Sequence, residues 1–206
     1  MSDEHYFSSE PRVASRRVNV RVVLPDRKMD FQTDRGVFAH GRLDRGTELL
    51  LRSVQPPQRG ALLDLGCGYG AIAVTMALRA PAATIWAIDV NARARELTAE
   101  NARLERATNV HVGTPNDVPD LLQFDAVYSN PPVRLGKAQL HDVVLTWLRR
   151  LRPDGVAYLV VQRHLGSDTL ARWLIDQGLA VSRVRSRQAY RLLEVRPATG
   201  DAHHGA

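Results

Sequence analysis

Short apolar runs alternate with helix-like segments over residues 60–197. Several of the runs, such as ALLDLG (61–66) and GVAYLVVQ (155–162), are apolar almost throughout, which is typical of parallel strands covered on both faces. The segment NARARELTAENARLER carries one apolar stripe and begins at Asn91, a residue type that caps helices. This alternation predicts an α/β fold with a doubly wound, Rossmann-like sheet.

The same pattern predicts seven strands and four helices, preceded by an extension. The predicted strands are 61–66, 84–90, 109–113, 124–129, 155–162, 179–184 and 190–195, and the predicted helices are about 70–80, 91–105, 138–151 and 168–177. Upstream, VNVRVVL alternates with period two, and GVFAHGRLDRGTELLLRSV ends in a helical pattern. We therefore divide the chain into an irregular segment (1–18), a β-hairpin and short helix extension (19–59), the α/β domain (60–197) and a disordered tail (198–206).

The charge of the chain favours a polyanionic partner. Lysine and arginine together number 28 against 22 acids, which gives a net charge of +6, and only Lys28 and Lys137 are lysines. Guanidinium groups bind phosphates bidentately, so an arginine surplus suits nucleic acid. An arginine-rich genome would explain the preference for arginine, but it would not explain the excess of positive charge.

Other features place the protein in the cytoplasm, with no membrane partner. The N-terminus is polar and lacks the apolar region of a signal peptide. No stretch approaches the roughly 20 apolar residues of a membrane helix. Cys67 is the single cysteine, which excludes an internal disulfide and fits a reducing compartment. The histidines are scattered, and we expect no metal site.

A glycine loop follows the first predicted strand of the domain. In DLGCGYGA (64–71), Gly66, Gly68 and Gly70 stand between a strand and a helix. Glycines there permit a tight turn and let a ligand approach the N–H groups at the helix N-terminus. Because the loop also satisfies the dinucleotide fingerprint, NAD stays an alternative ligand for the loop alone.

Two acids distinguish between these ligands. Asp64 precedes the first glycine by two residues, where a carboxylate suits an ammonium group and is awkward beside a pyrophosphate. Asp89 ends the second strand at the spacing of about 20 residues where an acid binds a ribose diol. A nucleoside that carries an amino acid instead of phosphates meets both requirements, which predicts S-adenosyl-L-methionine as the cofactor.

Further residues belong to this predicted cofactor site. Val90 lies next to Asp89, and Cys67 lies within the glycine loop, where we interpret it as structural. Asn116 or Asp117, in GTPNDVPD, can accept a hydrogen bond from the adenine amino group. An ordinary turn stabilised by its Asx side chain explains that segment equally well.

The sequence SNPP closes the fourth predicted strand. Asn130 is followed by Pro131 and Pro132, which end the strand and fix the backbone. The Asn130 side-chain oxygen and the Pro131 carbonyl can both accept from one planar NH₂ group, which directs its lone pair towards the sulfonium methyl. Methyl transfer then depends on alignment and on stabilisation of growing positive charge. A simple strand-ending turn is the alternative.

In this order and spacing, LDLGCGYG, IDV and FDAVYSNPP resemble the class I S-adenosylmethionine-dependent methyltransferases with an asparagine-proline-proline motif. GVFAHGRLDRGTELLL, SNPPVRLGK and LVVQRHLGSDTL resemble more closely the methyltransferase small domain of RsmC-type ribosomal RNA guanine-N2 methyltransferases. The resemblance covers roughly residues 5–197. It implies a seven-stranded sheet with an antiparallel last strand, and methylation of the exocyclic N2 amine of a guanine in ribosomal RNA or a ribosomal subunit.

The chain departs from RsmC-type enzymes at the acceptor site. Those enzymes often carry an aromatic residue after the prolines, where this chain has Val133. Phe38 is a candidate for stacking on the base, and Arg134 and Lys137 are candidates for holding a phosphate. Asp44 is interpreted as a helix cap, with the methionine end of the cofactor as its alternative neighbour.

The chain also has one such domain where RsmC-type proteins have two. Arginines near the two ends can take over RNA contacts, or a partner can: Arg12, Arg16, Arg17, Arg21, Arg183, Arg185, Arg187 and Arg191. Competing hypotheses are a protein glutamine-N5 methyltransferase, a DNA adenine-N6 methyltransferase and a non-catalytic RNA-binding assembly factor. The target nucleotide and the oligomeric state stay open.

Overall fold

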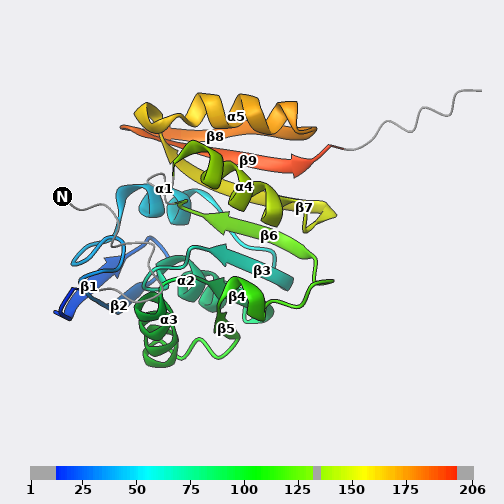
Figure 1. Ribbon diagram of the computed structural model, residues 1–206. Helices are drawn as coiled ribbons and strands as arrows, with labels where there is room; N and C mark the ends of the chain where they lie inside the picture. The colour runs from blue at the N-terminus through cyan, green and yellow to red at the C-terminus, as the bar shows by residue number, and fades with distance from the viewer. Residues whose placement is uncertain (1–12, 132–135, 199–206) are drawn as a thin grey trace, which may run out of the picture.

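A seven-stranded sheet forms the centre of the molecule (Figure 1). The computed structural model describes residues 13–131 and 136–198. The strands lie in the order β5-β4-β3-β6-β7-β9-β8. They are β3 (Arg59–Leu65), β4 (Ala82–Ile88), β5 (Val110–Gly113), β6 (Phe124–Ser129), β7 (Leu151–Gln162), β8 (Leu179–Arg187) and β9 (Tyr190–Pro197). Only β9 runs opposite to the other six strands of this sheet, which confirms the predicted sheet with an antiparallel last strand.

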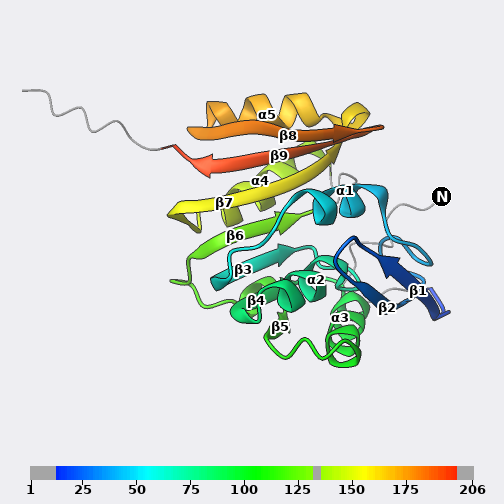
Figure 2. The same cartoon turned by 180° about the vertical axis from the view of Figure 1, so that it is seen from behind.

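Helices cover both faces of the sheet (Figures 1 and 2). One face carries α1 (Arg45–Ser53), α2 (Ala71–Arg79) and α3 (Ala92–Leu104), and the other carries α4 (Lys137–Leu148) and α5 (Ser167–Asp176). Successive residues of β3 alternate between the two layers: Leu62 belongs to the core under α1–α3, and Leu63 to the core under α4 and α5. Burial on both faces explains why these strands are apolar almost throughout. No helix in the described part of the chain is long and apolar enough to cross a membrane.

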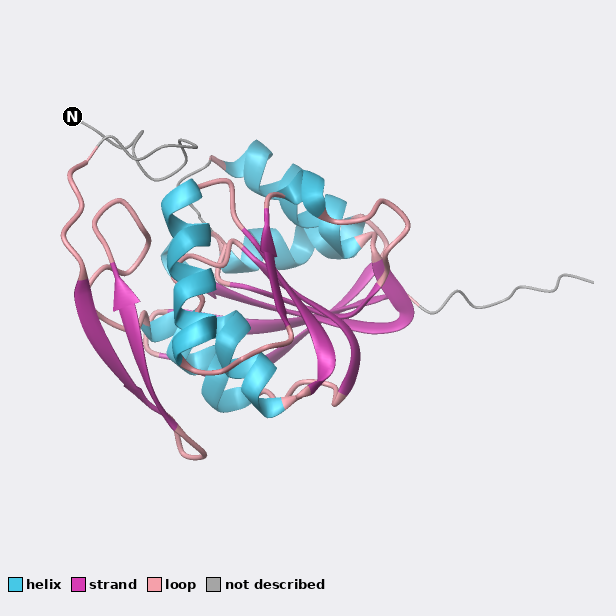
Figure 3. Ribbon diagram, turned by 90° about the horizontal axis from the view of Figure 1, so that it is seen from below, coloured by secondary structure: helices cyan, strands magenta, loops and turns pink. Residues whose placement is uncertain are grey.

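The predicted N-terminal hairpin is present and lies beside α3 (Figure 3). Its strands, β1 (Val18–Val23) and β2 (Lys28–Thr33), pair antiparallel. The buried Asn101 side chain of α3 accepts from the Gln32 N–H at 2.8 Å and donates to the carbonyls of Gln32 (2.9 Å) and Tyr69 (2.7 Å). One amide therefore connects the hairpin to the glycine loop.

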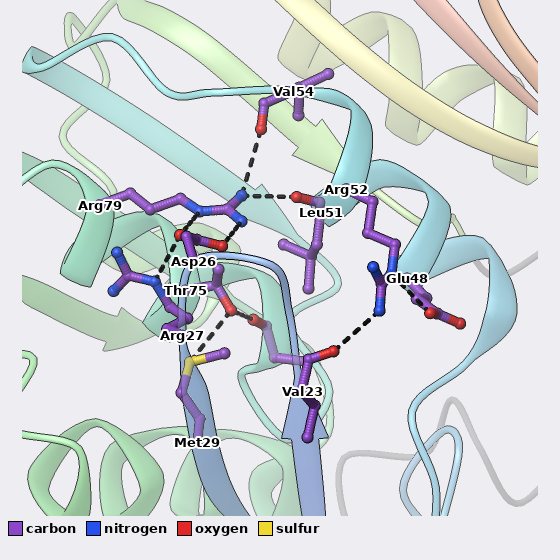
Figure 4. Close-up of polar contacts among 11 residues, drawn as sticks. Val23, Asp26, Arg27, Met29, Glu48, Leu51, Arg52, Val54, Thr75 and Arg79 are labelled. Carbon is purple, nitrogen blue, oxygen red and sulfur yellow. Dashed lines mark hydrogen bonds and ion pairs between the residues drawn. The ribbon is translucent and has the colours of Figure 1, made fainter.

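A second connection is the ion pair between Arg79 and Asp26 (Figure 4). The Arg79 guanidinium, at the end of α2, donates to both Asp26 oxygens at 2.9 and 2.7 Å and to the carbonyls of Leu51 and Val54. These hydrogen bonds from Arg79 hold the pKa of Asp26 well below its usual range. The hairpin turn, the end of α1 and α2 are thus held together, which fixes the segment between β2 and α1 at the carboxyl ends of the parallel strands.

Most element ends differ from the prediction by one or two residues, and two strand ends differ by three or more. β7 begins at Leu151 rather than 155, because its first residue pairs with Phe124 ahead of an irregularity in register. The turn-like residues Pro153 and Gly155 hid this extension. β8 continues to Arg187 rather than 184, because it is an edge strand whose exposed arginines carry no apolar signal. Residues 1–12 and the tail beyond residue 198 lie outside the described residues.

Candidate active site

The glycine loop is anchored between β3, β4 and α2. The N–H groups of Gly66 and Cys67 both donate to the carbonyl of Ile88, the last residue of β4, at 2.9 and 3.0 Å. Gly70 has a φ of +89°, and a Cβ there would lie 3.0 Å from the Thr98 methyl group and 3.2 Å from the Thr98 Cα. Both the left-handed backbone and the close approach of α3 therefore require glycine at this position.

Asp64 lies directly beneath this loop and is 1% exposed. Its Oδ2 accepts from the Ala73 N–H at 2.9 Å, while its Oδ1 is buried with no hydrogen-bond partner among the described residues. Burial raises the pKa of Asp64 to about 7. A buried carboxylate with a free oxygen is costly unless a cation or a donor comes to it, so the arrangement fits a ligand ammonium group or a water that it holds.

Asp89 follows β4 directly and faces the same loop. Its Oδ2 accepts from the Gly68 N–H at 3.0 Å and its Oδ1 from the Asn91 N–H at 2.9 Å. Burial raises the pKa of Asp89. Each carboxylate oxygen keeps a free lone pair, which allows a diol to be bound. The neighbouring Val90 is 47% exposed.

Asn91 and the segment before α1 close this side of the site. Asn91 caps α3 as predicted, because its side chain accepts from the Ala94 N–H. Its Nδ2 also donates to the carbonyl of Gly36 at 2.8 Å. The helix cap therefore fixes the segment that contains Phe38 beside the glycine loop.

The two adenine candidates lie in a 3₁₀ turn after β5, η2 (Pro115–Asp117). The Asp117 carboxylate accepts from the Thr114 N–H and hydroxyl at 2.6 and 2.8 Å, and these hydrogen bonds lower its pKa. Asn116 is exposed. Asp117 thus stabilises its own turn, whereas Asn116 faces outward at the carboxyl end of β5.

Asn130 emerges from the end of β6, and its amide group is fixed by α1. Its Nδ2 donates to Asp44 Oδ1 at 2.6 Å and to Thr47 Oγ1 at 3.1 Å. Asp44 Oδ1 also accepts from the N–H groups of Gly46 and Thr47, so the predicted helix cap is confirmed. With its NH₂ group engaged, the Asn130 side-chain oxygen accepts no hydrogen bond from the described residues and can serve as an acceptor for a ligand.

Two residues that sequence reasoning missed complete this network. The Tyr190 hydroxyl, from β9, donates to Asp44 Oδ2 at 3.2 Å, and it accepts from the Gln162 Nε2 at 2.9 Å. Gln162 is the last residue of β7. No motif marks either residue, because each one reaches Asp44 only through the pairing of β7 with β9.

A small pocket joins the two halves of the site. Its lining is Phe38, Ala39, Asp44, Thr47, Gly66, Cys67, Gly68, Tyr69, Ala71, Ile72 and Asn130. The fold therefore brings the glycine loop, Asn130 and Phe38 together. Phe38 is 51% exposed at the rim, while Cys67 is buried against the Thr98 hydroxyl, and burial raises the pKa of its thiol.

The remaining acceptor-side candidates do not line the pocket or lie outside the described residues. Pro131 is buried directly after Asn130. Lys137 is exposed at the first position of α4 and is not part of the pocket lining. Pro132, Val133 and Arg134 lie outside the described residues.

The sheet has the strand order and the antiparallel β9 of the S-adenosylmethionine-dependent methyltransferases. As in that architecture, the pocket lies between the glycine loop and Asn130 at the end of β6. The family model of the methyltransferase small domain matches residues 28–194. The chain belongs to this family and is a methyltransferase whose cofactor is S-adenosyl-L-methionine.

Relatives and solved structures agree with this assignment. The Bacillus subtilis protein YbxB is 32% identical over 197 residues, covering 94% of this chain and 98% of YbxB. The ribosomal RNA small subunit methyltransferase C of Pseudomonas aeruginosa is 32% identical over 179 residues, covering 77% of this chain and 52% of that enzyme. The structure of a T. thermophilus 16S rRNA N2 methyltransferase (RsmC), in complex with AdoMet and guanosine, has a TM-score of 0.75 at 22% identity, covering 91% of this chain and 52% of that one. The chain thus spans about half the length of these ribosomal RNA methyltransferases.

Proposed function

We propose that the protein transfers a methyl group from S-adenosylmethionine to the exocyclic N2 amine of a guanine in ribosomal RNA. The observation that carries this proposal is the fixed orientation of Asn130 at the pocket wall. Its NH₂ group is held by Asp44 and Thr47, which leaves its oxygen to accept from a substrate amine. A nitrogen acceptor needs such a hydrogen-bond acceptor beside the methyl donor.

The cofactor half of the pocket fits S-adenosylmethionine. The free Oδ1 of Asp64 is a partner for the methionine ammonium, directly or through a water, and the Asp89 carboxylate is a partner for the ribose hydroxyls. Val90 borders the adenine, and Asn116 is better placed than Asp117 to accept from its amino group, because Asp117 is engaged with Thr114. When bound, the cofactor supplies an electrophilic sulfonium methyl group.

On the acceptor side, the residues align the amine. The Asn130 oxygen and the Pro131 carbonyl accept hydrogen bonds from its two N–H groups, which directs the nitrogen lone pair towards the methyl carbon. With the cofactor bound, methyl transfer would form a carbon–nitrogen bond as the carbon–sulfur bond breaks, S-adenosylhomocysteine would be released, and the methylated nitrogen would lose a proton to solvent. The two acceptors stabilise the positive charge that grows on the nitrogen.

The substrate class follows from the relatives, the charge and the rim of the pocket. The ribosomal RNA methyltransferases named above supply the RNA assignment, and the net charge of +6 agrees with it. The target base must be unpaired or flipped to reach the pocket. Exposed Phe38 is the aromatic surface on which it would stack. Lys137 stays a candidate for a phosphate contact, as do Val133 and Arg134 for the base and its phosphate.

Transfer of radiolabelled methyl from S-adenosylmethionine tests the proposal. Deproteinised ribosomal RNA, isolated ribosomal subunits and release factor serve as parallel acceptors, and the RNA is digested to nucleosides afterwards. Label in N2-methylguanosine supports the proposal, and the preferred acceptor shows whether naked RNA or an assembled subunit is methylated. Label only in release factor would overturn it in favour of a glutamine-N5 methyltransferase. Cofactor binding without any transfer would favour a non-catalytic assembly factor.

A further inference from the structure

The edge strand β8 changes the face to which its arginines point. Residues opposite one another in an antiparallel pair share a face of the sheet. Arg183 lies opposite Leu193, in the core under α4 and α5, while Arg185 lies opposite Leu192, in the core under α1–α3. The register shift between them leaves Val184 as the extra residue of a bulge. Without this bulge, the period-two pattern would place Arg183 and Arg185 on one face.

Arg183, the arginine on the α5 face, forms an ion pair with an acidic residue. Asp168 of α5 pairs with Arg183 at 3.4 Å and also with the buried Arg191. Two of the N-terminal candidates also form ion pairs, Arg17 with Glu100 and Arg21 with Asp30. Four of the eight arginines proposed from the sequence for RNA contact therefore have carboxylate partners within the fold: Arg17, Arg21, Arg183 and Arg191.

The arginines on the other face lack such partners and lie close to the active site. Arg187 is opposite Tyr190, whose hydroxyl donates to the same Asp44 that holds Asn130. Arg45 directly follows Asp44, and its Nη1 donates to Gln188 in the β8–β9 turn at 3.3 Å.

Arg163, after β7, lies beside the same turn, because its backbone N–H donates to the carbonyl of Ala189. We call Arg45, Arg163, Arg185 and Arg187 the arginine rim. All four are exposed, and none forms an ion pair within the described part of the chain. Of the four, Arg163 also lines an open hollow, together with His164, Asp168, Gln188 and Ala189.

We propose that the arginine rim binds the phosphate backbone of the RNA strand that carries the target base, as that strand leaves the pocket past Asn130. Four guanidinium groups that lack carboxylate partners among the described residues, gathered around one turn, suit successive phosphates, which they can bind bidentately. The bulge in β8 has a role in this, because it moves Arg185 and Arg187 to the face that bears the active site. The inference rests on the proposed function for its substrate and adds the path of that substrate over the protein.

The test compares two double variants with the same loss of charge. R185A/R187A removes half of the arginine rim, whereas R59A/R149A removes two exposed arginines at the start of β3 and the end of α4, at the amino ends of the parallel strands and thus at the end of the sheet opposite the active site. Binding of a fluorescein-labelled single-stranded RNA oligonucleotide is followed by anisotropy over a range of salt concentrations. Binding of S-adenosylmethionine serves as the check that each variant is folded.

For R185A/R187A we expect roughly tenfold weaker RNA binding, and a salt dependence whose slope is smaller by about 2, or about 1 for each lost phosphate contact. R59A/R149A should stay close to wild type. Equal effects of the two variants would show that only net charge matters and would overturn the inference, as would no effect of either.

Methyl transfer to ribosomal RNA, measured in parallel, separates the inference from the proposed function. If the wild-type protein methylates RNA and R185A/R187A binds and methylates it as well as wild type does, the inference fails and the function stands. If the wild-type protein binds RNA through the rim without methylating it, the inference stands and the function fails. Failure of the wild-type protein to bind RNA would overturn both.

Discussion

The two halves of the active site are built from different parts of the chain. In the cofactor half, backbone N–H groups hold the functional side chains in place: Asp64 accepts from the Ala73 N–H, and Asp89 accepts from the N–H groups of Gly68 and Asn91. In the acceptor half, the side chain of Asn130 is held by the side chains of Asp44 and Thr47. A half built from backbone depends on a few glycines and acids, whereas a half built from side chains depends on every member of its network.

Asn130→Ala should have the largest effect on methyl transfer, and it should distinguish the acceptor half from the cofactor half most clearly. The change removes the acceptor for the substrate amine, and we expect methyl transfer to fall by about 10³-fold. Cofactor affinity should stay within about twofold of wild type, because Asp64, Asp89 and the loop N–H groups are untouched. Single-turnover transfer and calorimetric binding of S-adenosylmethionine measure the two quantities. Full turnover by Asn130→Ala would refute the assigned role of this residue.

Asp64→Asn should weaken cofactor binding but increase the stability of the free protein. Loss of the carboxylate removes the partner of the ligand ammonium, so cofactor affinity should fall by about 10- to 100-fold. The same change should stabilise the free protein, because a buried carboxylate with an unpartnered oxygen is lost.

The gain in stability should depend on pH. The pKa of Asp64 is raised from 3.8 to about 7 on folding. Its carboxyl group therefore destabilises the folded protein least below pH 4, where it is protonated in both states, and it destabilises the folded protein increasingly as the pH rises to 7. The advantage of the variant in the free energy of unfolding should grow over this window towards an upper limit of about 4 kcal/mol. Urea unfolding at pH 4 and pH 8 checks this. An advantage independent of pH would contradict the assignment.

Gly70→Ala tests the dependence of the cofactor half on backbone geometry. The new Cβ would be strained by the φ of +89° and would meet Thr98 at 3.0 Å, so we expect a loss of about 2–4 kcal/mol in unfolding free energy and weaker cofactor binding. Gly178→Ala is the matched control, because Gly178 has a φ of +81° but nothing within 4 Å of its Cβ position. It should lose only about 1 kcal/mol. Equal losses would show that α3 can move away from the loop.

The difference between the halves also explains what the sequence could predict. The glycine loop, Asp64 and Asp89 are recognisable because each lies at or directly after the end of a strand, so that position along the chain determines position in space. Tyr190 and Gln162 are not recognisable, since they reach Asp44 only through the order of β7 and β9. The division of the β8 arginines between two faces depends on a bulge at Val184 that no residue pattern indicates.

Tyr190→Phe has the smallest expected effect and asks how far the side-chain network extends. Removal of the hydroxyl leaves Asp44 bound to Asn130 and the helix cap, but it takes one donor from Asp44 Oδ2 and leaves Gln162 without its acceptor. We expect kcat to fall about 3- to 10-fold through looser orientation of Asn130, with little change in the KM for the cofactor. A structural role alone would lower stability without this selective loss of kcat.

Tyr128→Phe is the matched control for this variant. Tyr128 lies on β6, two residues before Asn130, and its buried hydroxyl has no partner among the described residues. Removing it should leave kcat unchanged and should not lower the free energy of unfolding, since no hydrogen bond is lost. If both variants reduce kcat alike, the ring packing around β6 governs the orientation of Asn130. A fall with Tyr190→Phe alone would extend the acceptor half of the site from β6 through Asp44 to β9, the one antiparallel strand of the sheet.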